Sequence, residues 1–583
     1  MLYNKKKDEL PEVTVQKIKD ILKKIGIENL KEIIGQKKVD FHGLESLTIT
    51  LSDDLYYSSN GKGITLDYAK ASAYGEFMER LQNGASYNIT PPDTKLIKAE
   101  DFLNNSILKY WVSRDNTKIN EYIERILDIC DNYKTQKNSE NRLIEVLPFY
   151  HVNNGKIEYI SPHLLQYTGG FTGSCAGNTP YEALVEGLSE VFERYVIRKA
   201  ITESVSFPDI PEECYLKYDA IKKIVDYIKE IGLSVTVKDA SFNGKYPVIC
   251  TVLKDEENKG YYAWFGAHPF LPVAIERCFT ETFQGMDFSS KQYVSRYFKF
   301  EGKKDNPIPD AKIDNAFNNR FLEVNTDFFS INPEYIFNEN NWINNFEVSN
   351  KELFHAMINK LIQSDMDVFI RDVSFLGFPS YTICIPELMS NFYNINPHSG
   401  IDLRMNYYKC VKIMGENIPS NLTEKEILDF FKYFFCMQFI NIKNYKNIEM
   451  LYIITLLREK LYKKALAIIT ALKKTNKYSK YIKMLSFLEN YILMILERKN
   501  NNDINNGLSD KYGKYFTLKM EKIFLSENSF ENAINTLKKS KLYSLKHIKE
   551  EDLYKKEKIV EKVMNIYKKN IPDQMLVKKL LET

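Results

Sequence analysis

A chain of 583 residues is long enough for two or more domains, and a composition of 44% hydrophobic and 13% aromatic residues can fill substantial cores. The formal net charge of +3 is close to balance, so it gives no reason to expect nucleic acid or an anionic membrane as a direct partner. The eight cysteines form no C-x-x-C motif, and neither a signal-peptide core nor a bilayer-spanning apolar run is present. We therefore expect a cytoplasmic protein with reduced thiols.

The first predicted unit joins a strand over residues 46–51 to a helix over residues 66–84. The turn before the helix reads Asn60-Gly61-Lys62-Gly63, which lacks the G-x-x-x-x-G-K-[ST] pattern of a Walker A phosphate loop. On the helix, Glu76, Glu79 and Arg80 share one face at spacings of three and four residues. This unit offers acids and a cation on its helix without a standard phosphate loop.

The densest chemistry lies in GSCAGNTPYEALVEGLSEVFERYVIR, residues 173–198, where a Gly-rich turn runs into a helix. At about 100° per residue, four glutamates share one narrow stripe: Glu182, Glu186, Glu190 and Glu193. Acidic neighbours at i, i+4 destabilise a helix by roughly 0.2–0.5 kcal/mol per pair, and a divalent cation such as Mg²⁺ would remove that cost. The alternative is a solvated acidic face. Apolar residues cover most of the remaining circumference, which favours a largely buried helix.

The start of that helix carries a capping signature. Thr179 is the expected N-cap, Pro180 the first helical residue, and Glu182 the capping-box acid at the third position. Backbone N–H groups just after Ala176-Gly177-Asn178 are placed to hold an anion. A structural role for Glu182 and a role at a metal both stay open.

The third predicted unit contains strands over residues 246–253 and 260–267. Gly266-Ala267-His268-Pro269 then leads into a helix over residues 273–285, which carries Arg277 and Glu281 at i, i+4. Alone, that pair is no more than a surface salt bridge of little energetic value. Three strand-turn-helix units, each with an acid and an arginine on its helix, are harder to explain as surface salt bridges than one such pair is.

Glycine and proline usage marks a domain boundary. After two further strand-like stretches, 367–373 and 381–386, only Gly507, Gly513 and Pro572 follow residue 420, out of 24 glycines and 19 prolines in the chain. We predict an α/β domain over residues 1–415 and an all-α domain over residues 421–583. Segments 462–466 and 530–534 resemble the second helix of a degenerate tetratricopeptide (TPR) unit, although no strict 34-residue period is visible. Helical repeats bind partners or their own copy, so we expect a homodimer.

Three ordered strings carry a family resemblance: GKGxxxxxAxxSAxGExxERL from Gly61, SxAGNTxxEAxxxGLSEVFERYV from Ser174 and GAHPxxxVAxER from Gly266. Together they resemble the YcaO family, and most of all the bacterial branch regarded as accessory factors for methylthiolation of ribosomal protein S12. The resemblance implies a mixed α/β ATP-binding core. It also implies an ATP- and Mg²⁺-dependent enzyme that phosphorylates a backbone amide oxygen, so that a nucleophile can add to the carbon.

The resemblance also implies roles for individual residues. The Mg²⁺ ligands of the family fall on Glu76, Glu79, Glu190 and Glu193. The nucleotide contacts fall on Lys7, Thr14, Arg80, Asn178, Glu182, Arg194 and Arg277.

Three positions depart from the family pattern. Thr14 replaces a Ser, Glu186 stands where close relatives carry Gln, and Cys175 stands where they carry Ser or Ala. Cys175 is either a buried small hydrophobe or a nucleophile, and the absence of a His placed to activate it favours the first. The role of Glu186 stays open.

Several functions remain possible at this point. The protein is an ATP-using enzyme acting on a peptide or protein, with a cyclodehydratase or a thioamide-forming enzyme as alternatives, or it is a nucleotide-regulated scaffold. Possible partners are ribosomal protein S12 and a radical-SAM methylthiotransferase. The chain lacks the C-x₃-C-x₂-C cluster motif and so is not that methylthiotransferase itself. No catalytic residue, substrate or nucleophile is assigned by these motifs.

Overall fold

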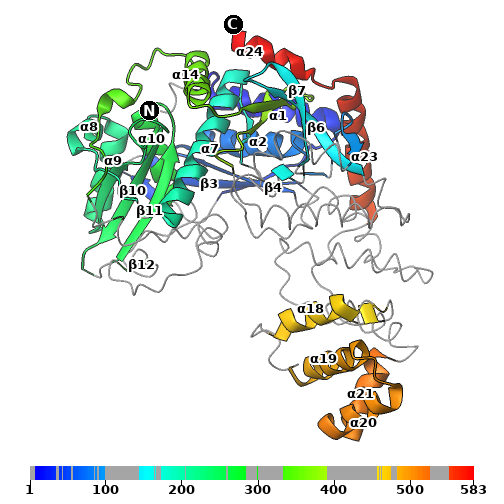
Figure 1. Cartoon of the computed structure of the whole chain (residues 1–583). Coiled ribbons are helices and arrows are strands. Elements are labelled where there is room, and N and C mark those ends of the chain that lie inside the picture. Colours follow the sequence, from blue (N-terminus) through cyan, green and yellow to red (C-terminus); the bar gives the residue numbers. More distant parts are fainter. Residues whose placement is uncertain are drawn as a thin grey trace. The chain divides into compact units, whose positions relative to one another are not determined.

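The computed structural model divides the chain into two compact units: unit 1 is Met1–Ile401 with Tyr554–Thr583, and unit 2 is Asp402–Leu553 (Figure 1). The residues that the structure describes are 7–34, 39–41, 44–53, 57–98 except 85, 88 and 90, 143–165 except 163, 172–257 except 204, 260–283, 298–299, 328, 332–389, 453, 456–457, 460, 462–473, 482–525 and 550–582.

Unit 1 is built on three antiparallel sheets. The first has the order β1-β3-β2 with β4 also paired to β3, and its strands are β1 (Lys31–Ile34), β2 (Val39–Phe41), β3 (Leu44–Ser52) and β4 (Ser58–Gly63). The second has the order β12-β11-β10-β9, from β9 (Ser234–Asp239), β10 (Val248–Asp255), β11 (Gly260–Ala267) and β12 (Phe298–Lys299). The third has the order β5-β6-β13-β14-β8 with β7 on β6, from β5 (Lys95–Lys98), β6 (Leu143–His151), β7 (Lys156–Ile160), β8 (Ser174–Ala176), β13 (Phe369–Asp372) and β14 (Ser380–Cys384).

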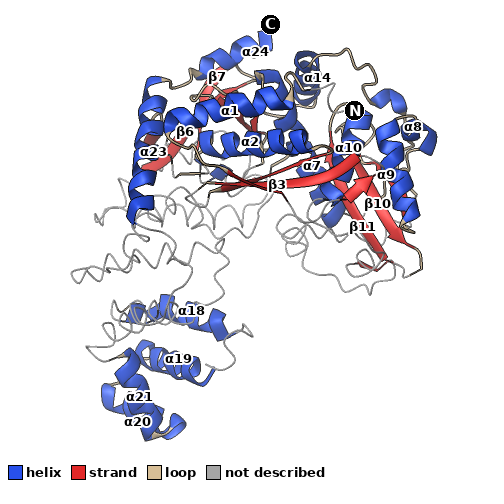
Figure 2. Cartoon of the chain, turned by 180° about the vertical axis from the view of Figure 1, so that it is seen from behind, coloured by secondary structure: helices blue, strands red, loops and turns tan. Residues whose placement is uncertain are grey.

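Helices pack between and against these sheets, so the predicted mixed α/β core is confirmed. They are α1 (Pro11–Ile25), α2 (Leu66–Gln82), α7 (Pro180–Thr202), α8 (Glu212–Leu216), α9 (Asp219–Glu230), α10 (Leu271–Phe283) and α14 (Asn350–Gln363). The helix α1 runs beside α2, and α2 packs on β3 (Figure 2). Each predicted strand of the first 400 residues is present as β3, β10, β11, β13 or β14; β11 has the predicted bounds, and the ends of the others are shifted by one or two residues.

Each of the three strand-turn-helix units depends on a glycine next to its helix. A Cβ on Gly61 of β4 would lie 2.1 Å from the Ala69 carbonyl oxygen of α2. A Cβ on Gly177 before α7, or on Gly266 of β11 before α10, would lie 2.7 Å from the backbone of the following helix. Only glycine permits this approach, because no real Cβ comes so close to backbone atoms. The three helices therefore start close to their strands.

The helix α7 is the central element of unit 1. It contacts β8 and β14 of the third sheet. It also contacts β10 and β11 of the second sheet, beside which it runs in Figure 1. Fourteen of its residues are buried, from Glu182 to Ile201. The apolar ones join the largest hydrophobic cluster of the described chain, which explains why α7 is a fixed platform for any side chain on its remaining face.

The last thirty residues pack with unit 1, which corrects the predicted domain division. From α23 (Glu550–Lys569), Ile559, Val563 and Tyr567 enter the core formed by α1, α2 and β3. The Tyr567 ring stacks on Phe375 with centroids 3.7 Å apart. The 3₁₀ turn η6 (Gln574–Leu576) and α24 (Val577–Glu582) follow, and Val577 is buried in the core around α7. Low Gly and Pro content correctly indicated helix here, but it carries no information on which core a helix joins.

Unit 2 is helical in its described part. Its helices α18 (Tyr462–Lys473), α19 (Ile482–Leu496), α20 (Asn501–Tyr512) and α21 (Lys514–Phe524) each pack on the next. The first predicted TPR segment coincides with the start of α18, whereas residues 530–534 lie outside the described residues. Across the described helices of both units, none combines the length and apolar character that crossing a bilayer requires.

Candidate functional site

The N-terminus of α7 is capped as the sequence predicts. Thr179 adopts extended backbone and its hydroxyl accepts a hydrogen bond from the Glu182 N–H at 3.2 Å, while Pro180 opens the helix. The Glu182 carboxylate is buried, and it accepts from the Asn178 amide at 3.1 Å and from the Asp8 N–H at 2.9 Å. Thr14 of α1 donates to the Asn178 side-chain oxygen at 2.8 Å. Three predicted nucleotide residues are therefore linked directly: Thr14, Asn178 and Glu182.

Glu186, one turn further along α7, is held by two cations. The Lys7 ammonium lies 2.9 Å from Glu186 Oε1 and 3.4 Å from Glu182 Oε1, and Arg277 of α10 forms an ion pair with Glu186 Oε2. Burial alone would raise the pKa of Glu186, but the charges of Arg277 and Lys7 outweigh it and hold that pKa well below its usual range. The sequence left the role of Glu186 open. In the structure it forms ion pairs with two residues that are predicted to bind the nucleotide, Lys7 and Arg277.

The other predicted acids extend the site toward α2. Burial, the Glu190 charge and the Glu76 charge raise the pKa of Glu79 well above its usual range. Glu76 accepts from the Asn60 N–H at 2.8 Å and forms an ion pair with Arg80. The structure therefore brings an acid pair of α2 next to the acid face of α7, although the two lie more than 100 residues apart in sequence.

Glu190 lies close to Glu193 of its own pair and to Glu79 of the pair on α2. Burial raises its pKa, the nearby Glu193 charge raises it further, and Arg194, at 3.6 Å, lowers it without reversing the shift. Glu193 itself is buried. The face of α7 thus divides into a first half, where cations compensate Glu182 and Glu186, and a second half, where the Glu190 charge raises the pKa of Glu79 on α2.

The acid pairs fit Mg²⁺ held mainly by a nucleotide. In the part of the chain that the structure describes, His, Cys, Asp and Glu side chains form no group of three or more able to hold a metal ion by themselves. Mg²⁺ is typically held by one or two carboxylates together with phosphate oxygens and water. Two carboxylate pairs, Glu76 with Glu79 and Glu190 with Glu193, match that need. The raised pKa of Glu79 reflects first its burial and then the charges of Glu190 and Glu76, which a cation would neutralise.

Two alternatives from the sequence are resolved by burial. The acidic face of α7 is not a solvated surface, because the exposed fractions of the Glu182 and Glu186 side chains are 5% and 21%. The Cys175 thiol lies against Gly187, where an added Cβ would come within 2.7 Å of Sγ. Burial raises the pKa of Cys175 well above its usual range, so it remains a thiol and acts as a small core residue.

Two polar residues of this region escaped the sequence analysis as site residues. Asp8 binds Thr179 and also accepts from the Asn350 amide of α14 at 2.9 Å, which fixes the N-terminal segment against α7. Lys62 of β4 forms an ion pair with Glu281 of α10. The G-K-G string had marked Lys62 only as part of a turn, and no local pattern marks Asp8.

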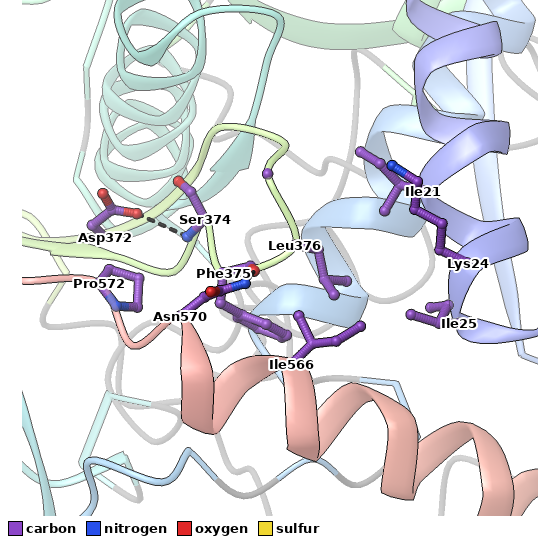
Figure 3. A pocket seen from close by; sticks show the side chains of 11 residues that line it. Ile21, Lys24, Ile25, Asp372, Ser374, Phe375, Leu376, Ile566, Asn570 and Pro572 are labelled. Atoms are coloured by element: carbon purple, nitrogen blue, oxygen red, sulfur yellow. Dashed lines mark hydrogen bonds between the residues drawn. The ribbon is translucent and has the colours of Figure 1, made fainter.

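A separate cavity of about 470 Å³ lies elsewhere in unit 1 (Figure 3). Ile21 and Ile25 of α1 face Leu376 after β13 and Ile566 of α23 across it. None of the predicted nucleotide or metal residues lines this cavity, so its size is no argument for placing the nucleotide there.

The family model described as YcaO cyclodehydratase, ATP- and Mg²⁺-binding, matches residues 60–389, more than half of the chain. The protein belongs to the YcaO family. The match covers the turn and helix of the first strand-turn-helix unit and all of the other two, and it begins after Lys7 and Thr14.

Two curated relatives support this membership. The ribosomal protein S12 methylthiotransferase accessory factor YcaO of Escherichia coli K12 is 32% identical over 350 residues, 58% of each chain. An uncharacterised protein of Haemophilus influenzae is 30% identical over 351 residues, 58% of this chain and 57% of the relative. The chain thus matches less than two thirds of either relative.

Solved structures that match part of the chain include a heterocyclase in complex with substrate and cofactor, with a TM-score of 0.47 and 17% identity over 66% of this chain and 52% of the other. Another is YcaO from Methanopyrus kandleri bound with AMPPCP and Mg²⁺, with a TM-score of 0.40 and 15% identity over 66% of this chain and 93% of the other.

Proposed function

We propose that this YcaO protein binds Mg·ATP on the polar face of α7 and uses it to activate a backbone amide of a peptide or protein. The observation that carries the proposal is the division of that face. Its first half gathers Lys7 and Arg277 around Glu186, and its second half sets Glu190 against Glu79 with raised pKa values. Anionic phosphates suit the first half, and Mg²⁺ suits the second.

Each predicted residue has a chemical role in this proposal. Arg80, Arg194 and Arg277 would bind phosphate oxygens, for which the planar guanidinium fork is suited. Asn178 and Glu182, held by Thr14 and Asp8, would bind the uncharged parts of the nucleotide.

When bound, Mg²⁺ would neutralise phosphate charge, with Glu76, Glu79, Glu190 and Glu193 as its protein ligands. Phosphoryl transfer asks a protein mainly to position groups and to balance charge, and these side chains supply both.

The relatives suggest where this activity is used. We propose an accessory role in β-methylthiolation of ribosomal protein S12 in the cytoplasm, because the E. coli relative carries that name. Unit 2 would be a TPR-like domain that binds S12, a methylthiotransferase or a second copy of the chain. Its consecutive packing of α18 to α21 supports a helical-repeat architecture.

The metal ligands provide the direct test. Glu79→Gln and Glu190→Gln should each weaken Mg·ATP binding at least tenfold, because Mg²⁺ loses one of its anionic ligands while the side-chain shape is kept. Titration calorimetry in excess Mg²⁺ measures this, and circular dichroism checks the fold. Glu203→Gln at the exposed end of α7 is the matched control, since Glu203 pairs only with a neighbouring lysine, Lys199, among the described contacts. Wild-type affinity in both site variants would refute the proposal.

Turnover separates an enzyme from a scaffold. ATP hydrolysis by the purified protein that rises when an S12-derived peptide is added supports amide activation. Binding of Mg·ATP without turnover, with and without peptide, supports the nucleotide-regulated scaffold instead.

A further inference from the structure

Lys62 lies between two glycines that turn it away from α2. Along β4, Ser59 and Gly61 are buried against α2, and a Cβ on Gly63 would lie 2.5 Å from the Ala69 nitrogen of that helix. Side chains alternate along a strand, so Lys62 projects from the opposite face of β4. The two glycines of the G-K-G string therefore allow β4 to pack on α2 while the Lys62 side chain projects from the opposite face of the strand.

On that side Lys62 meets α10, where it forms an ion pair with Glu281. Glu281 follows Arg277 by one helical turn, and Arg277 is paired with Glu186 of α7. Arg277 and Glu281 lie on one face of α10, so these two contacts place the Lys62 ammonium on the side of α10 that meets α7.

We propose that Lys62 is a further cation of the nucleotide site. When ATP binds, the Lys62 ammonium separates from Glu281 and binds a phosphate oxygen. Glu281 is the positioning residue that holds Lys62 in place in the free protein. This inference rests on the proposed Mg·ATP site. The exposed fraction of the Lys62 side chain is 25%, so it is within reach of a ligand. A lysine ammonium on its flexible stem is a point charge that can exchange partners without rebuilding the backbone.

Replacement of the lysine tests the contact. Lys62→Met should weaken Mg·ATP binding about tenfold, with little change in melting temperature. Lys70→Met is a matched control, because Lys70 also pairs with a glutamate, Glu32 at 3.0 Å, and the exposed fraction of its side chain is 29%. Lys70 lies on α2 outside the predicted site, so its variant should bind Mg·ATP as the wild type does. Equal affinity of Lys62→Met and wild type would overturn the inference.

Replacement of the acid distinguishes a ligand contact from a structural ion pair. Glu281→Gln releases Lys62 and removes a negative charge near the phosphates, so it should tighten Mg·ATP binding. If the pair serves only the fold, Glu281→Gln and Lys62→Met should lower affinity and melting temperature equally, and that result would refute the proposal. Lys62→Arg keeps the charge and should retain more affinity than Lys62→Met, which gives a reading even if the Met variant folds poorly.

The failure of this inference can be told apart from failure of the proposed function. If wild-type protein does not bind Mg·ATP, the nucleotide site itself is wrong. If wild type binds and Glu79→Gln does not, while Lys62→Met binds normally, only the role of Lys62 is wrong.

Discussion

Two predicted nucleotide-binding residues meet at the Glu186 carboxylate: Lys7 of the N-terminal segment and Arg277 of α10. In the free protein an acid thus holds the cations that phosphates would need. Such pairing keeps the cations oriented and compensates the charge of a partly buried carboxylate. It also means that Lys7 and Arg277 would have to exchange the Glu186 carboxylate for phosphate oxygens when ATP binds.

Arg277→Lys tests the geometry of that exchange. Lysine keeps the charge but loses the bidentate fork, and charge-assisted hydrogen bonds contribute about 1.5–3 kcal/mol each. We expect Mg·ATP affinity to fall roughly tenfold, which corresponds to about 1.4 kcal/mol, with little loss of thermal stability. Competition with a fluorescent ATP analogue measures the affinity.

The control for this variant is Arg198→Lys, the same change on another helix, α7, beside Tyr195. If Arg277→Lys binds ATP as tightly as wild type does, Arg277 is not a nucleotide ligand and its pair with Glu186 is structural.

At the scale of elements, Glu32 ties the edge strand β1 to two helices. Its carboxylate lies 3.2 Å from Lys19 of α1, 3.0 Å from Lys70 of α2 and 2.9 Å from the Tyr74 hydroxyl. Burial by itself would raise the pKa of Glu32, but the bonds from Lys70, Tyr74 and Lys19 outweigh it and the pKa is lowered. The ionised carboxylate is therefore the form that the fold stabilises.

The sign of the pH dependence follows from that shift. Because the folded pKa lies below the unfolded value of about 4.3, the stabilisation is complete above that value and is lost as pH falls through the folded pKa. Glu32→Gln should lower the free energy of unfolding by about 1 kcal/mol at pH 7 and by progressively less below about pH 4. Denaturant titrations of wild type and variant at pH 7 and pH 3 measure the difference in the free energy of unfolding. Glu28→Gln, at an exposed position, is the control. A deficit that is equal at pH 7 and pH 3 would contradict this account.

At the scale of the whole molecule, the chain leaves unit 1 near residue 401 and returns to it at residue 554. The returning α23 supplies Tyr567, whose hydroxyl accepts a hydrogen bond at 3.2 Å from the buried Arg371. Arg371 also donates to Asp93 at 2.7 Å and to the Pro148 carbonyl at 2.9 Å. A buried arginine with three partners is costly to disturb, because any lost partner leaves charge uncompensated.

Truncation after Leu553 should therefore destabilise unit 1 strongly. It removes the buried apolar side chains Ile559, Val563, Tyr567 and Val577, and the loss of one large core side chain typically costs about 2–5 kcal/mol. We expect insoluble protein or a melting temperature far below that of the full chain. Tyr567→Phe is the graded control, since it keeps the ring stack and loses one hydrogen bond of about 1 kcal/mol. A truncated protein that melts like the full chain would show that α23 is dispensable.

The sequence determined the local structure and the chemistry it carries. Turn glycines, the Thr179-Pro180 cap and the 3.6-residue spacing of the glutamates on α7 act within about twenty residues, so they could be interpreted without a fold. The ordered strings also identified the family, which the family model confirms. Tertiary structure alone decided which cation meets which acid: Lys7 reaches Glu186 across 179 positions, and Lys62 of β4 meets Glu281 of α10. It also decided that α23 packs into the core of α1 and α2. The reason is that helical periodicity is a property of neighbouring residues, whereas a long-range contact depends on how all of the elements pack together.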